Sequence, residues 1–235
     1  MLVHNPVGGY RFLGVPEGPY SNGAVADAGL DLVHARFERP LPLAAGLKAA
    51  AQHVSGAGRP VLAITGFELR IPAPYSRGSW GAFNDGYVAQ LTGLGLEVDG
   101  LRPAARTNVA PVEGAVTEPS VHAFTYTAPG SRDRTAFVLA GVAEEKPGDA
   151  ASMLDSIMRQ LSGRLDELGR SWEDATALQL YGMEDMQGLL ADRVLKRLRH
   201  GVVLGIHWYP SMPPIDDLNL EIDVRSAGTE LVLPV

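Results

Sequence analysis

The chain has 235 residues, of which 46% are hydrophobic and 20% charged, and its net charge at pH 7 is −7. This balance is typical of a folded globular protein and excludes a disordered or collagen-like chain. Because nucleic-acid binding needs a concentrated basic face, we expect no nucleic-acid partner for so acidic a chain. The sequence contains no cysteine, which excludes disulfide bonds, a thiolate nucleophile and a zinc–thiolate site.

The sequence also predicts that the protein does not enter a membrane. No apolar run approaches the ~20 residues that cross a bilayer. Residues 1–6 lack the charged-then-apolar pattern of a signal peptide. We therefore expect a cytoplasmic protein.

The first half of the chain alternates strand and helix patterns. Apolar periodicity predicts a helix that begins after Pro42 and ends at Gly56, with apolar residues at helical spacing, and a second helix over 80–94. Strand patterns are found at 10–15, 24–37, 61–71, 107–111 and 120–127. The polar segment TAPGSRDR at 127–134 follows and is the best internal boundary.

The second half repeats this order of elements. Helices are predicted over 152–168 and 186–198, the first with Ser152 and Asp155 as a capping box and the second ending at Gly201. Strands are predicted at 135–143, 175–181, 202–209, 218–224 and 230–233. The recurring order predicts two tandem α+β units, residues 1–127 and 128–235, each a mixed sheet with two helices on one face. The other face of each sheet needs burial, through oligomerisation or by packing half on half.

Six segments resemble motifs of one family, the RidA/YjgF imine and enamine deaminases. In chain order they are GPYSN (18–22), FNDGY (83–87), PAARTNV (103–109), FVLAG (137–141), LGRSWED (168–174) and LEID (220–223). The resemblance covers nearly the whole chain as two divergent copies. It implies chorismate-mutase-like units, assembly as a homotrimer, and ligand sites in the clefts between units.

The resemblance also implies the roles of two residues. In that family an arginine on the PART strand clamps the substrate carboxylate, and a glutamate on the closing strand positions the attacking water. Carried over, these are Arg106 and Glu221. The family takes both from one unit, whereas here the first copy lacks the glutamate and the second lacks the arginine.

A partial similarity connects the chain to the chorismatases, which hydrolyse an enol ether. It rests on the YPSMPP run at 209–214, which leads to Glu221. Chorismatases are generally longer chains. The resemblance therefore leaves an imine, an enamine or an enol-ether carbon as the reacting centre.

The residue types suit these roles to different degrees. The planar fork of Arg106 suits bidentate carboxylate binding, although a surface ion pair is the alternative. Asn108 lies two residues on, on the same strand face, and can add a hydrogen bond. Glu221 alternates with apolar neighbours, a pattern typical of a solvated sheet face. A buried cleft would raise its pKa and suit it to proton transfer, and Asp223 is an alternative carboxylate.

Aromatic residues complete the candidate cleft. His207 is a candidate acid or base in the place of the missing arginine. Tyr20, Tyr126 and Tyr209 are candidates for the lining, each with packing or a turn position as the alternative. The histidines show no paired metal-ligand spacing, and no phosphate loop, dinucleotide fingerprint or serine elbow is present.

The sequence therefore predicts a cofactor-independent hydrolytic enzyme of the RidA-like superfamily acting on a small carboxylate-bearing metabolite. Addition of water to such a carbon needs acid–base catalysis but no metal. The alternative is a non-catalytic protein that binds a small anion or scaffolds a pathway, with a decayed site whose arginine and glutamate have separated. A ribonuclease activity is disfavoured by the acidic charge.

Overall fold

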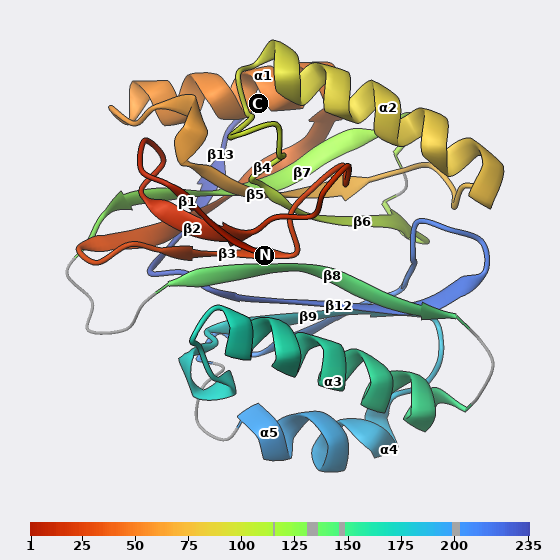
Figure 1. The fold of residues 1–235 in the computed structure, drawn as a ribbon. Coiled ribbons are helices and arrows are strands. Elements are labelled where there is room, and N and C mark those ends of the chain that lie inside the picture. Colours follow the sequence, from red (N-terminus) through yellow and green to blue (C-terminus); the bar gives the residue numbers. More distant parts are fainter. Residues whose placement is uncertain (115, 131–135, 146–148, 199–202) are drawn as a thin grey trace.

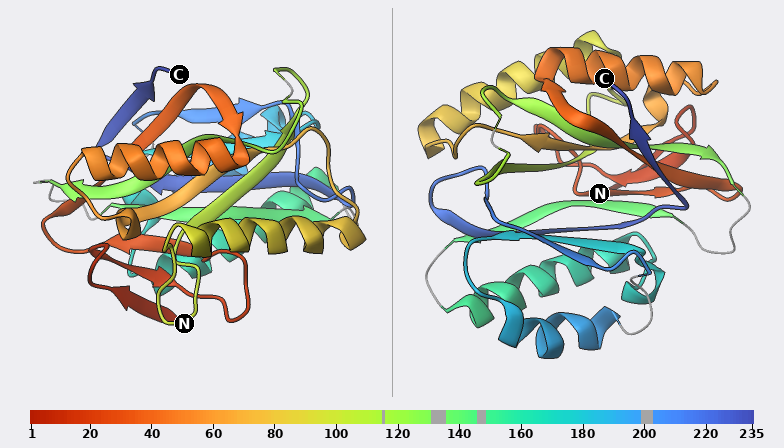
Figure 2. Two further views of the ribbon diagram at one scale, coloured as in Figure 1. Left: turned by 90° about the horizontal axis from the view of Figure 1, so that it is seen from above. Right: turned by 180° about the vertical axis from the view of Figure 1, so that it is seen from behind.

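A computed structural model describes residues 1–114, 116–130, 136–145, 149–198 and 203–235. Two β-sheets lie face to face at the centre, and a layer of helices covers the outer face of each (Figure 1). The view from behind in Figure 2 shows the same four layers. None of the described helices is both long and apolar enough to cross a membrane.

The six-stranded sheet belongs mainly to the first half of the chain and has the order β11-β6-β5-β7-β4-β13. Its strands are β4 (Leu30–Pro42), β5 (Ile64–Arg70), β6 (Ala105–Pro111), β7 (Ser120–Pro129), β11 (Ser211–Met212) and β13 (Thr229–Leu233). Helices α1 (Leu43–Gly56) and α2 (Arg77–Gly93) cover its outer face. A short 3₁₀ turn, Val61–Ala63, precedes β5.

The seven-stranded sheet has the order β1-β2-β3-β8-β12-β9-β10. Its strands are β1 (Leu2–Asn5), β2 (Tyr10–Leu13), β3 (Gly23–Ala26), β8 (Phe137–Glu145), β9 (Ala177–Gly182), β10 (Ile206–Tyr209) and β12 (Leu218–Ser226). Its outer face carries α3 (Ala150–Glu167), α4 (Gln187–Leu190), a π turn (Ala191–Leu195) and α5 (Lys196–Leu198). A 3₁₀ turn, Trp172–Asp174, joins α3 to β9.

Four strands of each sheet share one topology. In the first copy β4 and β5 flank β7 in antiparallel pairing, and β6 runs parallel to β5. In the second copy β8 and β9 flank β12 in antiparallel pairing, and β10 runs parallel to β9. The two copies therefore match strand for strand: β4 with β8, β7 with β12, β5 with β9 and β6 with β10. The predicted α+β fold of two tandem units is confirmed, and the halves pack against each other within one chain.

The ends of the chain cross between the two copies. Strand β3 pairs with β8 of the second copy, whereas β13 runs parallel to β4 of the first. Each sheet thus draws strands from both halves of the sequence. The expected boundary at residue 127 lies within β7, and the division there stays a prediction.

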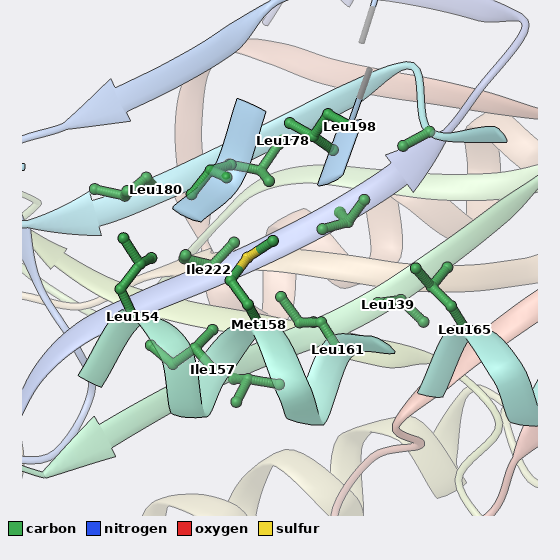
Figure 3. Packing of buried hydrophobic residues seen from close by; sticks show 14 of the residues in the cluster. Leu139, Leu154, Ile157, Met158, Leu161, Leu165, Leu178, Leu180, Leu198 and Ile222 are labelled. Carbon is green, nitrogen blue, oxygen red and sulfur yellow. The ribbon is translucent and has the colours of Figure 1, made fainter. Parts of the chain in front are cut away.

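The apolar core has two main parts, one between each sheet and its helices. Helix α3 buries one face, including Leu154, Ile157, Met158 and Leu161, against β8, β9 and β12 (Figure 3). Deleting such a fully buried leucine side chain typically costs roughly 2–5 kcal/mol of stability. A second cluster joins α1 and α2 to the six-stranded sheet.

Several predicted elements differ in detail from the structure. Helix α3 is capped by Asp149, whose carboxylate accepts a hydrogen bond from the Ser152 backbone N–H at 2.8 Å, so the capping box expected at Ser152 and Asp155 is wrong. The strand expected over 24–37 divides at Gly29, where a φ of +81° turns the chain between β3 and β4. The helix expected over 186–198 is interrupted by the π turn. Strands β1 and β11 were not expected, and Gly201 lies outside the described residues.

The layer between the two sheets is polar, which the strand patterns did not predict. Along β12 the alternating side chains Glu221, Asp223 and Arg225 face the six-stranded sheet and are at most 5% exposed. Glu68, Arg70 and Thr107 are buried in the same layer from the opposite sheet. Of the two interpretations of this face, the solvated one is wrong, because a second sheet covers it. The expected packing of half on half is what buries it.

Candidate active site

A cavity of about 220 Å³ opens between the sheets where β6 faces β12 and β8. Its lining consists of Tyr20, Trp80, Arg106, Asn108, Gly141, Val142, Ala143, Gln160, Arg164, Pro214, Ile215, Leu218 and Glu221. Arg106 comes from the first copy and Glu221 from the second. Face-to-face packing therefore brings together the two residues that the sequence divides between its halves.

The guanidinium of Arg106 sits in an aromatic box. Its carbon lies 4.3 Å from the ring centre of Tyr20, 4.9 Å from Trp80 and 4.8 Å from Tyr87. Nη2 donates a hydrogen bond to Asn84 Oδ1 at 2.9 Å, whereas the buried Nη1 has no partner. Burial lowers the pKa of Arg106, but arginine stays charged at any physiological pH. The aromatic box therefore holds the Arg106 cation with its Nη1 nitrogen available to a ligand.

Helix α2 supplies this box through regular spacing. Trp80, Asn84 and Tyr87 are four and three residues apart, which places them on one helix face. The RidA/YjgF motif that the FNDGY segment resembles is F-x-x-x-N-x-x-Y, and its spacing is matched by Trp80, Asn84 and Tyr87. The match that started at Phe83 is corrected accordingly. Trp80 was missed, and this spacing was the signal that could have found it.

Tyr20 reaches the cavity because the segment before β3 is fastened to the segment before β6. The Ser21 hydroxyl donates to the Pro103 carbonyl oxygen at 2.8 Å, and the Ser21 N–H donates to that of Ala104 at 3.0 Å. Arg102 Nε donates to the Gly18 carbonyl oxygen at 2.9 Å. The GPYSN segment thus holds the Tyr20 ring against Arg106.

Glu221 is the carboxyl group of the cavity and is 3% exposed. Burial, together with the nearby Asp223 carboxyl, raises its pKa to about 8, although a backbone hydrogen bond from Asn108 and the charge of Arg106 act in the other direction. Its Oε2 has no hydrogen-bond partner. A carboxyl group with this pKa can donate and accept a proton near neutral pH.

Gly141 on β8 makes room for this carboxyl group. A Cβ atom at position 141 would lie 1.9 Å from Glu221 Oε1 and 2.8 Å from Cδ. Real Cβ atoms do not approach other atoms so closely, so any larger residue displaces the carboxyl. The FVLAG segment, which the sequence flagged only as a motif, thus shapes the site.

Asn108 lies beside these groups, two residues after Arg106 on β6. It is 2% exposed, and neither its Oδ1 nor its Nδ2 has a hydrogen-bond partner. Buried amide groups are normally paired. Four unpartnered polar atoms therefore gather in this cavity, on Arg106, Asn108 and Glu221.

The structure does not bring every expected residue to this cavity. The Tyr126 hydroxyl lies 3.2 Å from His53 Nε2, beneath helix α1. His207 and Tyr209 line a separate cavity. Roles for these three at the Arg106 site stay predictions that no described contact supports.

The separate cavity, of about 260 Å³, opens where β10 faces β7 and β4. These strands are the counterparts of β6, β12 and β8, so the second cavity is the equivalent cleft of the other copy. His34 Nε2 lies 3.0 Å from Glu68 Oε1, and its Nδ1 contacts Glu230 Oε2. Arg225 Nε donates to Glu230 Oε1 at 3.2 Å, and its Nη1 lies 3.6 Å from Glu68 Oε1.

The charges of this second cavity compensate one another. Burial acts to raise the pKa of Glu68, but His34, Arg225 and Arg70 hold it well below its usual range. Burial acts to lower the pKa of His34, but its hydrogen bonds to Glu230 and Glu68 raise it overall. Neither here nor elsewhere among the described residues is a group of three or more His, Asp or Glu side chains placed to hold a metal ion.

The fold and the Arg106–Glu221 cavity describe a class of protein, an α+β protein of two repeated units with a buried arginine and a buried carboxyl group in one cavity. The family model described as "2-aminomuconate deaminase CnbZ" matches residues 2–160 and 150–231. A 2-amino-5-chloromuconate deaminase from Comamonas testosteroni is 33% identical over 252 aligned positions, which cover 99% of this chain and 98% of that protein. The chain belongs to the CnbZ family of 2-aminomuconate deaminases.

Among solved structures, Rv2704 of the YjgF/YER057c/UK114 family from Mycobacterium tuberculosis matches with a TM-score of 0.31 and 17% identity. The match covers 41% of this chain and 81% of that one. Family membership confirms the RidA/YjgF resemblance and the expected hydrolytic enzyme acting on a small carboxylate-bearing metabolite. Of the imine, enamine and enol-ether carbons that the sequence left open, it selects the enamine. The alternative of a non-catalytic binder is set aside.

Proposed function

We propose that the enzyme hydrolyses 2-aminomuconate or a ring-substituted relative at the Arg106–Glu221 cavity. The observation that carries this assignment is the meeting of the Arg106 guanidinium with a Glu221 carboxyl whose pKa is raised to about 8. The compound is a six-carbon diene with a carboxylate at each end and an amino group on C2. It offers an anion to Arg106 and an enamine to Glu221.

Arg106 holds the carboxylate on C1 and so places the amino carbon beside Glu221. Its unpartnered Nη1 supplies a donor, and the aromatic box fixes the plane of the guanidinium. Charge-assisted hydrogen bonds from an arginine fork orient a carboxylate as well as bind it. The unpartnered Oδ1 of Asn108 accepts a hydrogen bond from the substrate amino group.

Glu221 moves the protons. In its protonated form it donates a proton to C3 of the enamine, which leaves an iminium at C2. The resulting carboxylate takes a proton from a water molecule, whose oxygen bonds to C2. Glu221 then returns that proton to nitrogen, and the C2–N bond breaks to release ammonia. The Glu221 carboxylate takes the remaining hydroxyl proton, which leaves a ketone at C2 and restores the protonated form of Glu221. One water is consumed and one ammonia is released, so the atoms balance.

The test is turnover of freshly generated 2-aminomuconate, followed by ammonia release against a buffer blank. Glu221→Gln keeps the shape but cannot exchange the proton, so kcat falls by roughly 10²–10⁴-fold. Arg106→Lys keeps the charge but loses the fork, so KM rises. Arg36 lines the second cavity, so Arg36→Lys is the matched control and keeps the rate of the parent protein. No acceleration by the parent, or a rate that survives Glu221→Gln, contradicts the proposal.

The homotrimer and the cytoplasmic location remain proposals of the sequence analysis. The trimer is supported by the resemblance to the RidA/YjgF family and is checked by light scattering of the purified protein.

A further inference from the structure

A second arginine reaches the same cavity from the outer face of the seven-stranded sheet. Strand β3 pairs with β8 only up to Leu139, and the Ala140 N–H then donates to the Asn22 carbonyl oxygen. Beyond this point no described strand pairs with this edge of β8, and residues 141–143 line the cavity. Gln160 and Arg164, one turn apart on α3, line the cavity at this edge.

The guanidinium of Arg164 has few interactions of its own. In the described part of the chain it donates one hydrogen bond, from Nη1 to the Ala140 carbonyl oxygen at 2.8 Å, and forms no salt bridge. Burial lowers the pKa of Arg164, while Tyr20, Glu221 and Glu167 act in the opposite direction. The hydrogen bond to Ala140 fixes the side chain at the cavity edge, and no carboxylate of the described residues lies within salt-bridge distance of it.

The charge in the cavity is therefore unbalanced. Arg106 and Arg164 contribute two positive charges, and neither forms a salt bridge with a described carboxylate. The lining contains one carboxyl group, Glu221, which burial keeps largely protonated at neutral pH. Desolvated charges without partners are costly. A ligand with two negative charges would neutralise both arginines.

We propose that Arg164 binds the second carboxylate of the substrate, at the end of the chain remote from the amino group, and so makes the enzyme selective for dicarboxylates. This inference rests on the proposed function, which assigns the first carboxylate to Arg106. Gln160, one turn before Arg164 on α3, lines the same end of the cavity. Arg106 and Arg164 thus bind the two carboxylates at opposite ends of one substrate.

The test uses two unreactive analogues that differ only at the remote end. Muconate, hexa-2,4-dienedioate, carries both carboxylates, whereas hexa-2,4-dienoate has a methyl group in place of the second. Calorimetric titration at pH 7 gives the ratio of their dissociation constants. We expect the parent protein to bind muconate roughly 100-fold more tightly, because a buried charge pair is lost with the monocarboxylate.

Substitutions then assign this preference to a residue. Arg164→Met reduces the preference to about threefold or less, whereas Arg164→Lys, which keeps the charge, retains part of it. Arg159→Met, on an exposed turn of the same helix, is the matched control and keeps the full preference. With 2-aminomuconate as substrate, Arg164→Met raises KM more than it lowers kcat.

The outcomes separate this inference from the proposed function. If the parent protein binds both analogues equally, or if Arg164→Met keeps the preference for muconate, the role of Arg164 is wrong while the Arg106–Glu221 site stands. If neither analogue binds, or if Arg106→Lys weakens neither, the proposed site itself is wrong.

Discussion

The Arg106 cavity and the His34 cavity lie at equivalent places in the two copies, and they treat buried charge in opposite ways. In the His34 cavity, Glu68 and Glu230 pair with His34 and Arg225, and Gln179 Nε2 donates to Glu68 Oε1 at 2.9 Å. In the Arg106 cavity, by contrast, neither Arg106 nor Arg164 forms a salt bridge with a carboxylate of the described residues. Buried charges that form ion pairs with one another contribute to the fold, whereas buried charges without such a partner can be neutralised by a bound ligand of opposite charge. Two clefts built from equivalent strands can therefore serve different purposes.

The largest expected effect is on stability at the His34 cavity. Glu68→Gln removes the carboxylate that faces His34, Arg70 and Arg225, and so leaves buried cations without a partner. Breaking a buried ion pair from one side typically costs about 3–5 kcal/mol. We expect urea unfolding to show a loss of this size.

Glu230→Gln is the control for that substitution. Its side chain is 35% exposed, so water screens the lost charge and the cost is about 1 kcal/mol or less. The deaminase rate stays within about twofold of the parent, because general acid–base catalysis needs a group within reach of the substrate. Equal stability losses for the two variants, or loss of turnover with Glu230→Gln, would break the comparison.

The second expected effect is a gain in the free energy of unfolding when the carboxyl group of the Arg106 cavity is replaced. Glu221 has a pKa of about 8 in the folded protein and about 4.5 when unfolded. Between these values the folded chain holds a proton that the unfolded chain lacks, so this group lowers stability as pH rises. Glu221→Gln has no charge at any pH. It should be more stable than the parent by about 4 kcal/mol at pH 8, and by less than about 1 kcal/mol at pH 5.

Urea unfolding of both proteins at the two pH values measures this difference. The Glu221→Gln variant is therefore expected to gain stability and to lose deaminase activity in the turnover test, because active-site groups often serve function at a cost in stability. If the parent protein has the larger free energy of unfolding at pH 8, Glu221 is ionised and paired with a cation, as the carboxylates of the His34 cavity are.

The smallest expected effect sharpens the comparison without removing any charge. Gly141→Ala places a methyl group where the Glu221 carboxyl lies, so the carboxyl must move while the fold remains. A displacement of about 1 Å in a catalytic group can cost roughly 100-fold in rate. Gly163→Ala is the matched control: its Cβ meets no atom within 4 Å, and it lies in an exposed stretch of α3. Equal rates for the two variants would contradict the role given to Gly141.

Helix periodicity and turn residues were sufficient to predict most of the fold. The apolar spacing along α3 and the proline before α1 determined these helices nearly to the residue. The short β11 strand has two residues and carries no periodic signal. Its pairing with β6 depends on the tertiary fold alone.

The site was only partly predictable, for a physical reason. Arg106 and Glu221 lie in different halves of the sequence, and only the stacking of two sheets places them together. The same stacking turns the charged face of β12 from an expected solvated surface into a buried layer. Arg164 carried no signal, because an arginine on an amphipathic helix is typical of a solvated face.

The presence of both copies in one chain has a consequence for symmetry. In a symmetric homo-oligomer every substitution appears at every equivalent site, so no cleft can change alone. Here β12 and β7 are equivalent strands with different sequences, and Glu221 occurs on only one of them. A mutation therefore reaches one cleft and spares its counterpart. Covalent linkage of the two units removes the constraint of symmetry, and it allows one cleft to stay reactive while the other becomes part of the framework.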